Sequence, residues 1–318
     1  MRLPQGAAGA RVLAFGHYQP ANVVTNDDLA KTMDTSDEWI RSRVGIAERR
    51  LASPGETVVD LAVQAGGKAL ASSGLSPADI DLVIVSCCTA ETPVPAIAPR
   101  VAHRLGVNAP GAYDINAACA GFCYALSAAN DAVRTGSATN VLVVGAERFS
   151  NWVDWTDRTT AVIFADGAGA AVVGPSDTPG IGPVAWGSAG DKAEAIQVKD
   201  RTSYLRQEGQ TVFRWATTAL HPVAKLACER AGVQPEELAA FVPHQANLRI
   251  VEAIARKLGA ERAVIAKDIV LAGNTSAASI PLALSRMIER GEVPSGGLAL
   301  LLGFGAGLTY AGQVIEIP

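Results

Sequence analysis

The sequence predicts an α/β protein built from two similar halves. Short apolar runs alternate with longer helical segments, as is typical of buried strands connected by helices. Segments of the first half also recur in the second half at one constant spacing of 158 residues. The chain has 318 residues, of which 49% are hydrophobic and 18% charged, and it is therefore long enough to bury a large core.

Three apolar runs predict strands in the first half, and three longer segments predict helices. The runs are rich in β-branched residues and bounded by turn residues, whereas the helical segments are long enough for several turns. The predicted strands are 81–87, 140–146 and 167–174, and the predicted helices are 57–73, 96–105 and 119–135.

Three pairs of segments indicate an internal duplication. GLSPADIDLVIV resembles GVQPEELAAFVP, NAACAGFCYAL resembles NTSAASIPLAL, and VLVVG resembles LLLG. The first two pairs begin at Gly74 and Gly232 and at Asn116 and Asn274, and the third pair ends at Gly145 and Gly303. We expect an N-terminal half, 1–180, and a C-terminal half, 181–318, because proline and glycine interrupt the pattern near 175–187.

Two related halves that face each other form a cleft at the ends of their strands, where ligands commonly bind in α/β sheets. Ser86 and His244 follow corresponding strands, since they lie 158 residues apart. Asn116 and Asn274 precede corresponding helices at the same spacing. The duplication therefore predicts that polar side chains of both halves meet in one cleft.

Composition argues against several classes of protein. The net charge of −4 and the lack of a long basic run argue against a nucleic-acid-binding protein. The sequence contains no run of about 18 apolar residues, which a membrane-spanning helix would need. The N-terminus also lacks the apolar core of a signal peptide. We therefore expect a cytoplasmic protein. Five cysteines without a CxxC pair, together with four histidines, predict neither a disulfide framework nor a metal site.

Cys119 is the candidate nucleophile. It lies in DINAACAGFCYAL, between a strand that ends near Ile115 and a long apolar helix. A thiol at a helix N-terminus lies near the positive end of the helix dipole, which favours the thiolate. Small neighbours leave room for a substrate beside the sulfur. A buried structural cysteine fits the same position equally well.

His244 and Asn274 are the candidate partners of this thiol. His244 follows the predicted strand AAFVP, and Asn274 precedes a predicted helix in LAGNTSAASIPLAL. Taken singly, a histidine is more often a packing residue, and an asparagine here suits a helix N-cap. Together with Cys119 they place a thiol, an imidazole and an amide at the predicted cleft, which favours catalysis.

GFGAGLTYAG (303–312) predicts a glycine-rich loop between two strands. The chain contains neither the GxxxxGK[ST] pattern of a phosphate-binding loop nor the GxGxxG pattern of a dinucleotide site. Backbone N–H groups of this loop are suited to an oxyanion hole, and a plain tight turn is the alternative.

Seven motifs along the chain carry a family resemblance. They are DTSDEWIRSRVGI (34–46), ACAGF (118–122), TDR (156–158), FADGAGAAVV (164–173), PHQANLR (243–249), GNTSAAS (273–279) and GFGAG (303–307). From about Val12 to Gln313 the chain resembles β-ketoacyl-acyl-carrier-protein synthase III, a starter condensing enzyme of the thiolase superfamily, and the priming ketosynthases of aromatic polyketide pathways. Elongating ketosynthases typically use Cys-His-His, so Asn274 indicates the starter type. The resemblance implies a thiolase-like fold with a layered αβαβα core.

The resemblance also implies a reaction that starts fatty acid or polyketide synthesis. Cys119 would take an acyl group from acyl-CoA, which is a substrate, and no cofactor is expected. His244 and Asn274 would hydrogen-bond the thioester carbonyl of malonyl-acyl-carrier protein and stabilise the enolate formed on loss of CO₂. The enolate carbon would then attack the acyl-Cys. The backbone N–H groups of Cys119 and Ala306 would form an oxyanion hole.

Further residues receive binding roles from the resemblance alone. Trp39 and Arg158 would hold the CoA adenine between them, Arg43 would contact the CoA phosphates, and Phe164 would line the passage beside the thiol. Without the resemblance, each arginine would be interpreted as a solvated surface charge. The pantetheine tunnel would be lined by Phe213, Asn247 and Arg249, and the acyl carrier protein would dock on Arg249, Arg256 and Lys257.

The family is expected to form a homodimer in which Val94 of one subunit caps the acyl pocket of the other. A larger aromatic residue often occupies this place, and the segment 187–211 is shorter than its counterparts in primary metabolism. Both differences predict that the enzyme is not strictly specific for acetyl-CoA as the starter. Two alternatives remain: an acyltransferase of secondary metabolism that uses the same acyl-Cys without condensation, and a docking subunit that has lost catalysis, against which the intact Cys119 argues.

Overall fold

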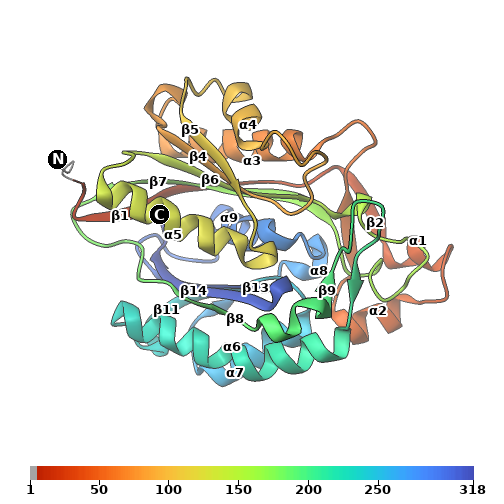
Figure 1. The fold of residues 1–318 in the computed structure, drawn as a ribbon. Helices are drawn as coiled ribbons and strands as arrows, with labels where there is room; N and C mark the ends of the chain where they lie inside the picture. The colour runs from red at the N-terminus through yellow and green to blue at the C-terminus, as the bar shows by residue number, and fades with distance from the viewer. Residues whose placement is uncertain (1–5) are drawn as a thin grey trace.

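The computed structural model describes residues 6–318, which form five alternating layers of helices and sheets (Figure 1). The strands of the first sheet are β1 (Gly9–Tyr18), β4 (Leu82–Ser86), β5 (Gly111–Ile115), β6 (Val141–Arg148) and β7 (Asp166–Ser176). Their order in the sheet is β1-β7-β6-β4-β5. Strands β5, β4 and β6 are parallel, whereas β7 is antiparallel to both of its neighbours.

The second sheet repeats this topology. Its strands are β8 (Ala185–Ser188), β11 (Leu238–Pro243), β12 (Val264–Ile265), β13 (Leu298–Gly305) and β14 (Thr309–Glu316). The order β12-β11-β13-β14-β8 has the same parallel and antiparallel pairings as the first sheet. The predicted α/β fold with two similar halves is confirmed, because each sheet has the same arrangement and is drawn from one part of the chain.

Helices fill the central layer and cover both outer faces (Figure 1). The central layer holds α5 (Gly121–Thr135) and α9 (Ser279–Glu289), most of whose residues are buried. The outer helices are α3 (Val58–Ser73) and α4 (Ala98–Arg104) on the first sheet, and α6 (Gly209–Ala231) and α7 (Leu248–Leu258) on the second. Helices α3 and α6 both end at a left-handed glycine, Gly74 and Gly232, which explains why this glycine recurs in the duplicated sequence.

The remaining elements lie mainly beside one end of the two sheets, at the right of Figure 1. They are the hairpin of β2 (Asn22–Thr25) and β3 (Glu48–Leu51), the short pair β9 (Ile196–Gln197) and β10 (Arg206–Gln207), and the helices α1 (Asn26–Ala30), α2 (Asp37–Val44) and α8 (Ile269–Ala272). Within residues 6–318, no helix is both long and apolar enough to cross a membrane.

Two predicted elements differ from the structure. The helix expected from residue 119 begins at Gly121, because a 3₁₀ turn, Ala118–Ala120, precedes it. The corresponding turn Ser276–Ala278 precedes α9, and we call these the first and second leading turns. The segment 303–312 is mostly strand: β13 continues to Gly305, β14 starts at Thr309, and only three residues connect them.

Each leading turn packs on a glycine of a central strand. A Cβ atom at Gly145 of β6 would lie 2.5 Å from the carbonyl oxygen of Ala277, and one at Gly303 of β13 would lie 2.9 Å from Cα of Ala120. These atoms belong to backbone, which cannot move aside as a flexible side chain can. The two sheets therefore approach the leading turns as closely as glycine allows.

We predict that Gly145→Ala lowers the free energy of unfolding by about 1–3 kcal/mol, the usual cost of overpacking a core. Gly55→Ala is the matched control, because Gly55 is exposed and an added Cβ meets nothing within 4 Å. Urea denaturation followed by circular dichroism compares the two variants with the parent protein. Equal stability of all three proteins would contradict the close packing of the second leading turn on β6.

Candidate active site

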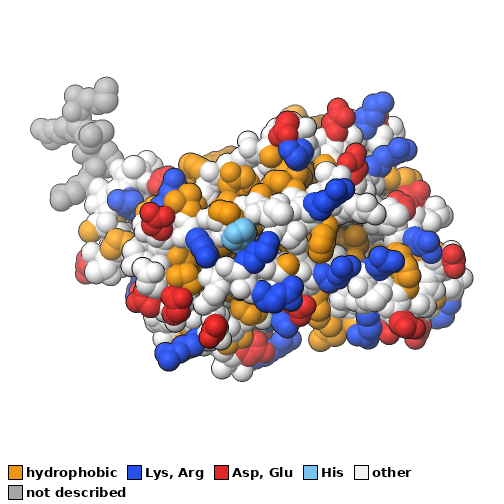
Figure 2. Space-filling model, turned by 90° about the horizontal axis from the view of Figure 1, so that it is seen from below, with side chains coloured by type: hydrophobic (Ala, Val, Ile, Leu, Met, Phe, Trp, Pro, Cys, Tyr) orange, Lys and Arg blue, Asp and Glu red, His pale blue; other side chains and the backbone are white. Residues whose placement is uncertain are grey.

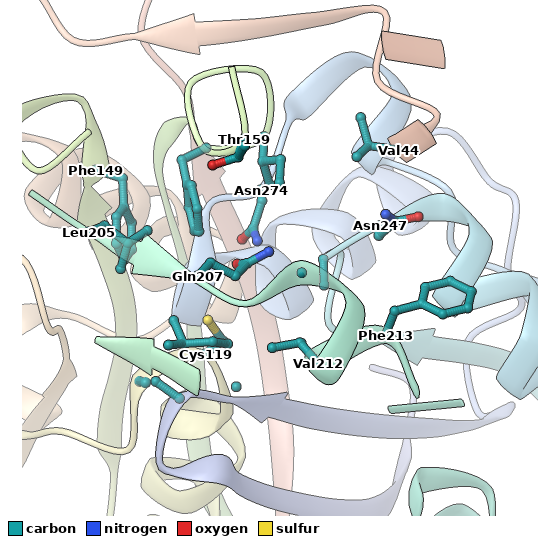
Figure 3. Close-up of a pocket in the computed structure, with 18 of the residues that line it drawn as sticks. Val44, Cys119, Phe149, Thr159, Leu205, Gln207, Val212, Phe213, Asn247 and Asn274 are labelled. Atoms are coloured by element: carbon teal, nitrogen blue, oxygen red, sulfur yellow. The ribbon is translucent and has the colours of Figure 1, made fainter. Parts of the chain in front are cut away.

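A cavity of about 920 Å³ opens between the two halves and reaches the surface beside α2 and α6. Cys119, His244 and Asn274, predicted from separate parts of the sequence, all line it. Figure 3 shows Cys119 and Asn274 on opposite sides of this space, with Gln207 between them in the view. The structure therefore brings the predicted thiol, imidazole and amide into one site.

Cys119 lies in the first leading turn, which has an unusual backbone. Ala118 has φ of 47°, in the left-handed region that L residues rarely adopt, and Asn116 Oδ1 accepts a hydrogen bond of 3.0 Å from its N–H. The second leading turn has the same features: Ser276 has φ of 52°, and Asn274 Oδ1 accepts its N–H at 2.8 Å. Both asparagines thus hold a strained turn, in addition to any role toward a substrate.

The thiol of Cys119 is protonated at neutral pH. Burial raises the pKa of Cys119 to about 12, although the Ser276 hydroxyl and the backbone N–H of Ala306 favour the thiolate. The Ser276 Oγ–Cys119 Sγ distance is 3.2 Å. The helix N-terminus was expected to favour the thiolate, and the loss of solvation opposes this effect at the buried sulfur. The sulfur needs a proton acceptor when it attacks.

His244 is held as a neutral donor. It follows β11, and its Nδ1 lies 2.7 Å from Ser279 Oγ, which also accepts the N–H of Gln245 at 3.2 Å. This hydroxyl has no other acceptor within the described residues, and we therefore infer that it donates to Nδ1 and that the ring hydrogen is on Nε2. Burial lowers the pKa of His244 to about 3, and the imidazole is therefore uncharged at neutral pH.

Asn274 offers its amide nitrogen to the cavity. Its Oδ1 is occupied by Ser276 N–H, which leaves Nδ2 as the free donor of a side chain that lines the cavity. Its backbone is anchored by bonds from Asn274 N–H to Ile163 O and from Ala165 N–H to Asn274 O, both of 2.9 Å. The site thus combines one thiol with two neutral donors from the other half of the chain.

Aromatic and basic side chains line the outer part of the cavity. The Arg158 guanidinium lies 5.1 Å from the centre of the Trp39 ring, and that of Arg43 lies 5.8 Å from it. Arg249 lies 5.1 Å from the Phe213 ring, and Asn247 caps α7 while its Nδ2 donates to Arg43 O at 3.1 Å. Phe164 lies deeper, stacked on Phe149 with ring centres 4.8 Å apart. All the residues predicted to bind CoA therefore line this cavity.

Three predicted residues lie outside the cavity. Val94 is 80% exposed and does not line the pocket of its own chain. Arg256 and Lys257 lie in the last turn of α7, where both are exposed and Lys257 Nζ donates to Thr217 O at 2.6 Å. Their predicted roles at a partner surface stay predictions.

Several residues of the site were not predicted from the sequence. The segment 187–211 contributes lining residues, among them Leu205, which Figure 3 shows beside Phe149, and Gln207, which it shows above Cys119. Glu147 and Ser276 lie behind the thiol, and both were within reach of sequence reasoning: Ser276 belongs to GNTSAAS, and Glu147 directly follows a predicted strand. A charged residue at the end of an otherwise apolar strand was the signal that could have identified Glu147.

Comparison with known proteins identifies the family. The family model for 3-oxoacyl-[acyl-carrier-protein (ACP)] synthase III matches residues 113–190, and the model for its C-terminal part matches 228–317. A relative from Streptomyces coelicolor, beta-ketoacyl-[acyl-carrier-protein] synthase III 4, is 58% identical over 313 residues, which cover 98% of this chain and 99% of the relative. The chain belongs to the 3-oxoacyl-[acyl-carrier-protein] synthase III family.

Solved structures agree with this assignment. The priming β-ketosynthase from the R1128 polyketide biosynthetic pathway is 45% identical, with a TM-score of 0.97 over 100% of this chain and 98% of the other. The 3-oxoacyl-[acyl-carrier-protein] synthase III from Aquifex aeolicus is 42% identical, with a TM-score of 0.92 over 97% and 100%. The predicted thiolase-like fold is confirmed, and the protein is an acyl-transferring condensing enzyme of the starter type.

Proposed function

We propose that Cys119 takes the acyl group of an acyl-CoA and that the acyl-enzyme then condenses with malonyl-acyl-carrier protein. The observation that carries this proposal is that His244 and Asn274 line the cavity that holds the thiol, with His244 Nδ1 bound to Ser279 and Asn274 Oδ1 bound to Ser276, so that Nε2 and Nδ2 are left for a substrate. Both groups donate without being charged, which suits the oxygen of an enolate as it develops negative charge. Decarboxylation generates the carbon nucleophile, so the reaction needs no strong base, and we propose that it uses no cofactor.

Backbone donors are suited to bind the oxyanion that forms when Cys119 attacks the acyl-CoA thioester. We propose that the N–H groups of Cys119 and Ala306 bind the thioester oxygen, because both favour negative charge on the sulfur of Cys119. Gly305 allows this arrangement, since a Cβ there would lie 2.7 Å from Cβ of Cys119. Bare backbone beside the nucleophile therefore leaves space for the tetrahedral adduct.

The outer cavity suits coenzyme A. Trp39 offers a ring for the adenine, and the neighbouring guanidinium groups offer positive charge for the phosphates. The separation of 5.1 Å between Arg158 and the Trp39 ring leaves no space for a second ring between them. Adenine binding in a sandwich therefore requires Arg158 to swing outward from its contact with Asp34, which lies 3.3 Å away.

Condensation and simple acyl transfer share the acyl-Cys and differ in the second step. Transfer to an oxygen, nitrogen or thiol acceptor requires no enolate, so the paired donors His244 and Asn274 favour condensation. Incubation with acyl-CoA and malonyl-acyl-carrier protein, followed by mass spectrometry of the products, tests the proposal. A β-ketoacyl-carrier product supports it, whereas an acyl-carrier product without loss of CO₂ would indicate the transferase.

We predict that His244→Ala and Asn274→Ala each slow malonyl-acyl-carrier-protein decarboxylation by about 10²–10³, the usual cost of one oxyanion donor. Acylation of Cys119 by acyl-CoA should change far less, because these donors act on the enolate. Intact-mass measurement of the acyl-enzyme and CO₂ release separate the two steps. Cys119→Ala is the control that abolishes acylation, and an equal loss of both steps in His244→Ala would contradict this division of roles.

We propose that the acidic carrier protein docks beside the cavity mouth, on the exposed side of α7. Arg249 and Arg256 are exposed there, and Figure 2 shows Lys and Arg side chains gathered over the face formed by α6 and α7. Long-range attraction between a basic face and an acidic partner accelerates and orients association.

Reversing charge at the end of α7 is therefore predicted to raise the KM for malonyl-acyl-carrier protein. Each exposed ion pair contributes about 1 kcal/mol or less, so Arg256→Glu should raise this KM a few-fold, with less effect at high salt. The KM for acyl-CoA should stay unchanged. Arg100→Glu, an exposed residue of α4 on the opposite outer layer, is the control, and equal KM changes for both substrates would argue against docking at α7.

We further propose that the enzyme works in the cytoplasm as a homodimer whose Val94 caps the partner's acyl pocket. The exposure of Val94 on its own chain supports an intermolecular role, because contact with a partner subunit would remove this apolar side chain from water. A valine cap leaves more apolar volume than an aromatic cap. Each additional CH₂ of the starter that is buried there adds about 0.8 kcal/mol to binding.

Branched or medium-length acyl-CoAs are accordingly expected to equal or exceed acetyl-CoA as starters, and Val94→Phe should shift the preference back toward acetyl-CoA. The measurement is kcat/KM for acetyl-, isobutyryl- and hexanoyl-CoA in both proteins, with sedimentation to establish the dimer. Unchanged selectivity in Val94→Phe would show that another wall, such as segment 187–211, limits the pocket.

A further inference from the structure

Glu147 is a buried carboxylate directly behind the nucleophile. It is the penultimate residue of β6 and has no exposed surface. Its Oε2 accepts hydrogen bonds from Thr89 Oγ1 at 2.6 Å and from Cys88 N–H at 3.2 Å. Its Oε1 accepts from Cys88 Sγ and from Ser276 Oγ, both at 3.2 Å. Each oxygen of the carboxylate therefore accepts at least two hydrogen bonds, and these bonds fix its position.

A single hydroxyl connects this carboxylate to the nucleophile. Ser276 Oγ lies 3.2 Å from Glu147 Oε1 and also 3.2 Å from Cys119 Sγ. The hydroxyl has only one hydrogen, which an ionised Glu147 attracts, so the oxygen is left to accept the S–H of Cys119. The contacts form a continuous path from the thiol to the carboxylate.

We propose that Glu147 accepts the proton of Cys119 through Ser276 during acylation and returns it to the departing coenzyme. As the sulfur bonds to the thioester carbon, its proton passes to Ser276 Oγ, and the serine hydrogen passes to Glu147 Oε1. The adduct then collapses, the bond between the acyl carbon and the CoA sulfur breaks, and the CoA thiolate takes up the proton held by Glu147. No net proton is consumed and no group is oxidised or reduced. This step rests on the acyl transfer proposed above.

The surroundings of Glu147 suit this exchange. The groups that face it from neighbouring elements are the thiols of Cys87, Cys88 and Cys119 and the hydroxyls of Thr89 and Ser276; no cation is among its hydrogen-bond partners within the described residues. Burial raises the pKa of Glu147 to about 7 and raises the pKa of all three thiols. Glu147 is therefore the group of this cluster that titrates near neutral pH.

His244 is poorly suited to the same task. Its Nδ1 already accepts the Ser279 hydroxyl, its Nε2 carries the hydrogen, and burial lowers its pKa to about 3. A ring with these properties is better suited to donate to an oxyanion than to take up the thiol proton. Glu147 and His244 thus divide acylation and decarboxylation between them.

The test measures the rate of Cys119 acylation by acyl-CoA between pH 5.5 and 8.5, by intact mass. Because the relay needs the carboxylate, the parent rate should rise with pH through about 7. In Glu147→Gln this rise should disappear, and acylation at high pH should fall about 10²-fold, the usual contribution of a general base. Malonyl-acyl-carrier-protein decarboxylation in the same preparation should persist, which shows that the site is intact.

Ser276→Ala tests the path without removing the carboxylate and decides the question if Glu147→Gln fails to fold. Alanine is compatible with the turn, because Ala118 adopts the same backbone at the equivalent position. It should lose acylation to a similar degree, whereas Ser285→Ala, which removes a buried hydroxyl bonded to His17 away from the cavity, should not. Parent-like acylation in Ser276→Ala, or a pH rise retained in Glu147→Gln, would overturn the relay. A parent protein that never acquires the acyl group would overturn the proposed acyl transfer itself and the relay with it.

Discussion

The contact between the two leading turns and the bare backbone of the central strands determines the site. Gly303 and Gly305 of β13 allow the first leading turn to approach the second sheet, and Gly145 of β6 allows the second turn to approach the first sheet. Side chains at these positions would hold the two turns apart. The nucleophile and Ser276 come within 3.2 Å of each other only because both turns lie in this narrow central layer.

The two duplicated halves differ at the positions that surround the thiol. Ser86 and His244 end corresponding strands, but His244 meets Ser279, whereas the position equivalent to Ser279 is Gly121, and Ser86 Oγ has no partner within the described residues. Glu147 likewise corresponds to Gly305. One half therefore keeps a glycine beside the thiol while the other keeps a carboxylate behind it. A fully symmetric protein would have glycine or glutamate at both positions, so it could not combine the space beside the thiol with a carboxylate behind it.

The sequence was sufficient to predict the two similar halves, and the family resemblance implied the layers; the three side chains proposed to react do line one cavity. Constant spacing identified the duplication, and the ends of strands and helices identified Cys119, His244 and Asn274, because strand ends meet at one cleft in such folds. Leu205 and Gln207 could not be predicted in this way, since they lie in a segment without periodicity whose path depends on tertiary contacts, such as Leu205 N–H to Trp152 O at 2.8 Å. The effect of burial on the Cys119 pKa could not be predicted for a related reason: the helix terminus is visible in a sequence, whereas the extent of burial is not.

Burial explains the character of the whole site. The same loss of solvation raises the pKa values of Cys119 and Glu147 and lowers that of His244, so each group is driven toward its uncharged form. An enolate or a tetrahedral oxyanion formed here meets fixed dipoles rather than mobile water, and these dipoles require no reorganisation during the reaction. Burial, however, also limits the access of the thiol to water as a proton acceptor. An acceptor built into the protein is then needed, and a carboxylate whose pKa lies near neutrality takes and returns a proton more readily than one that is fully solvated.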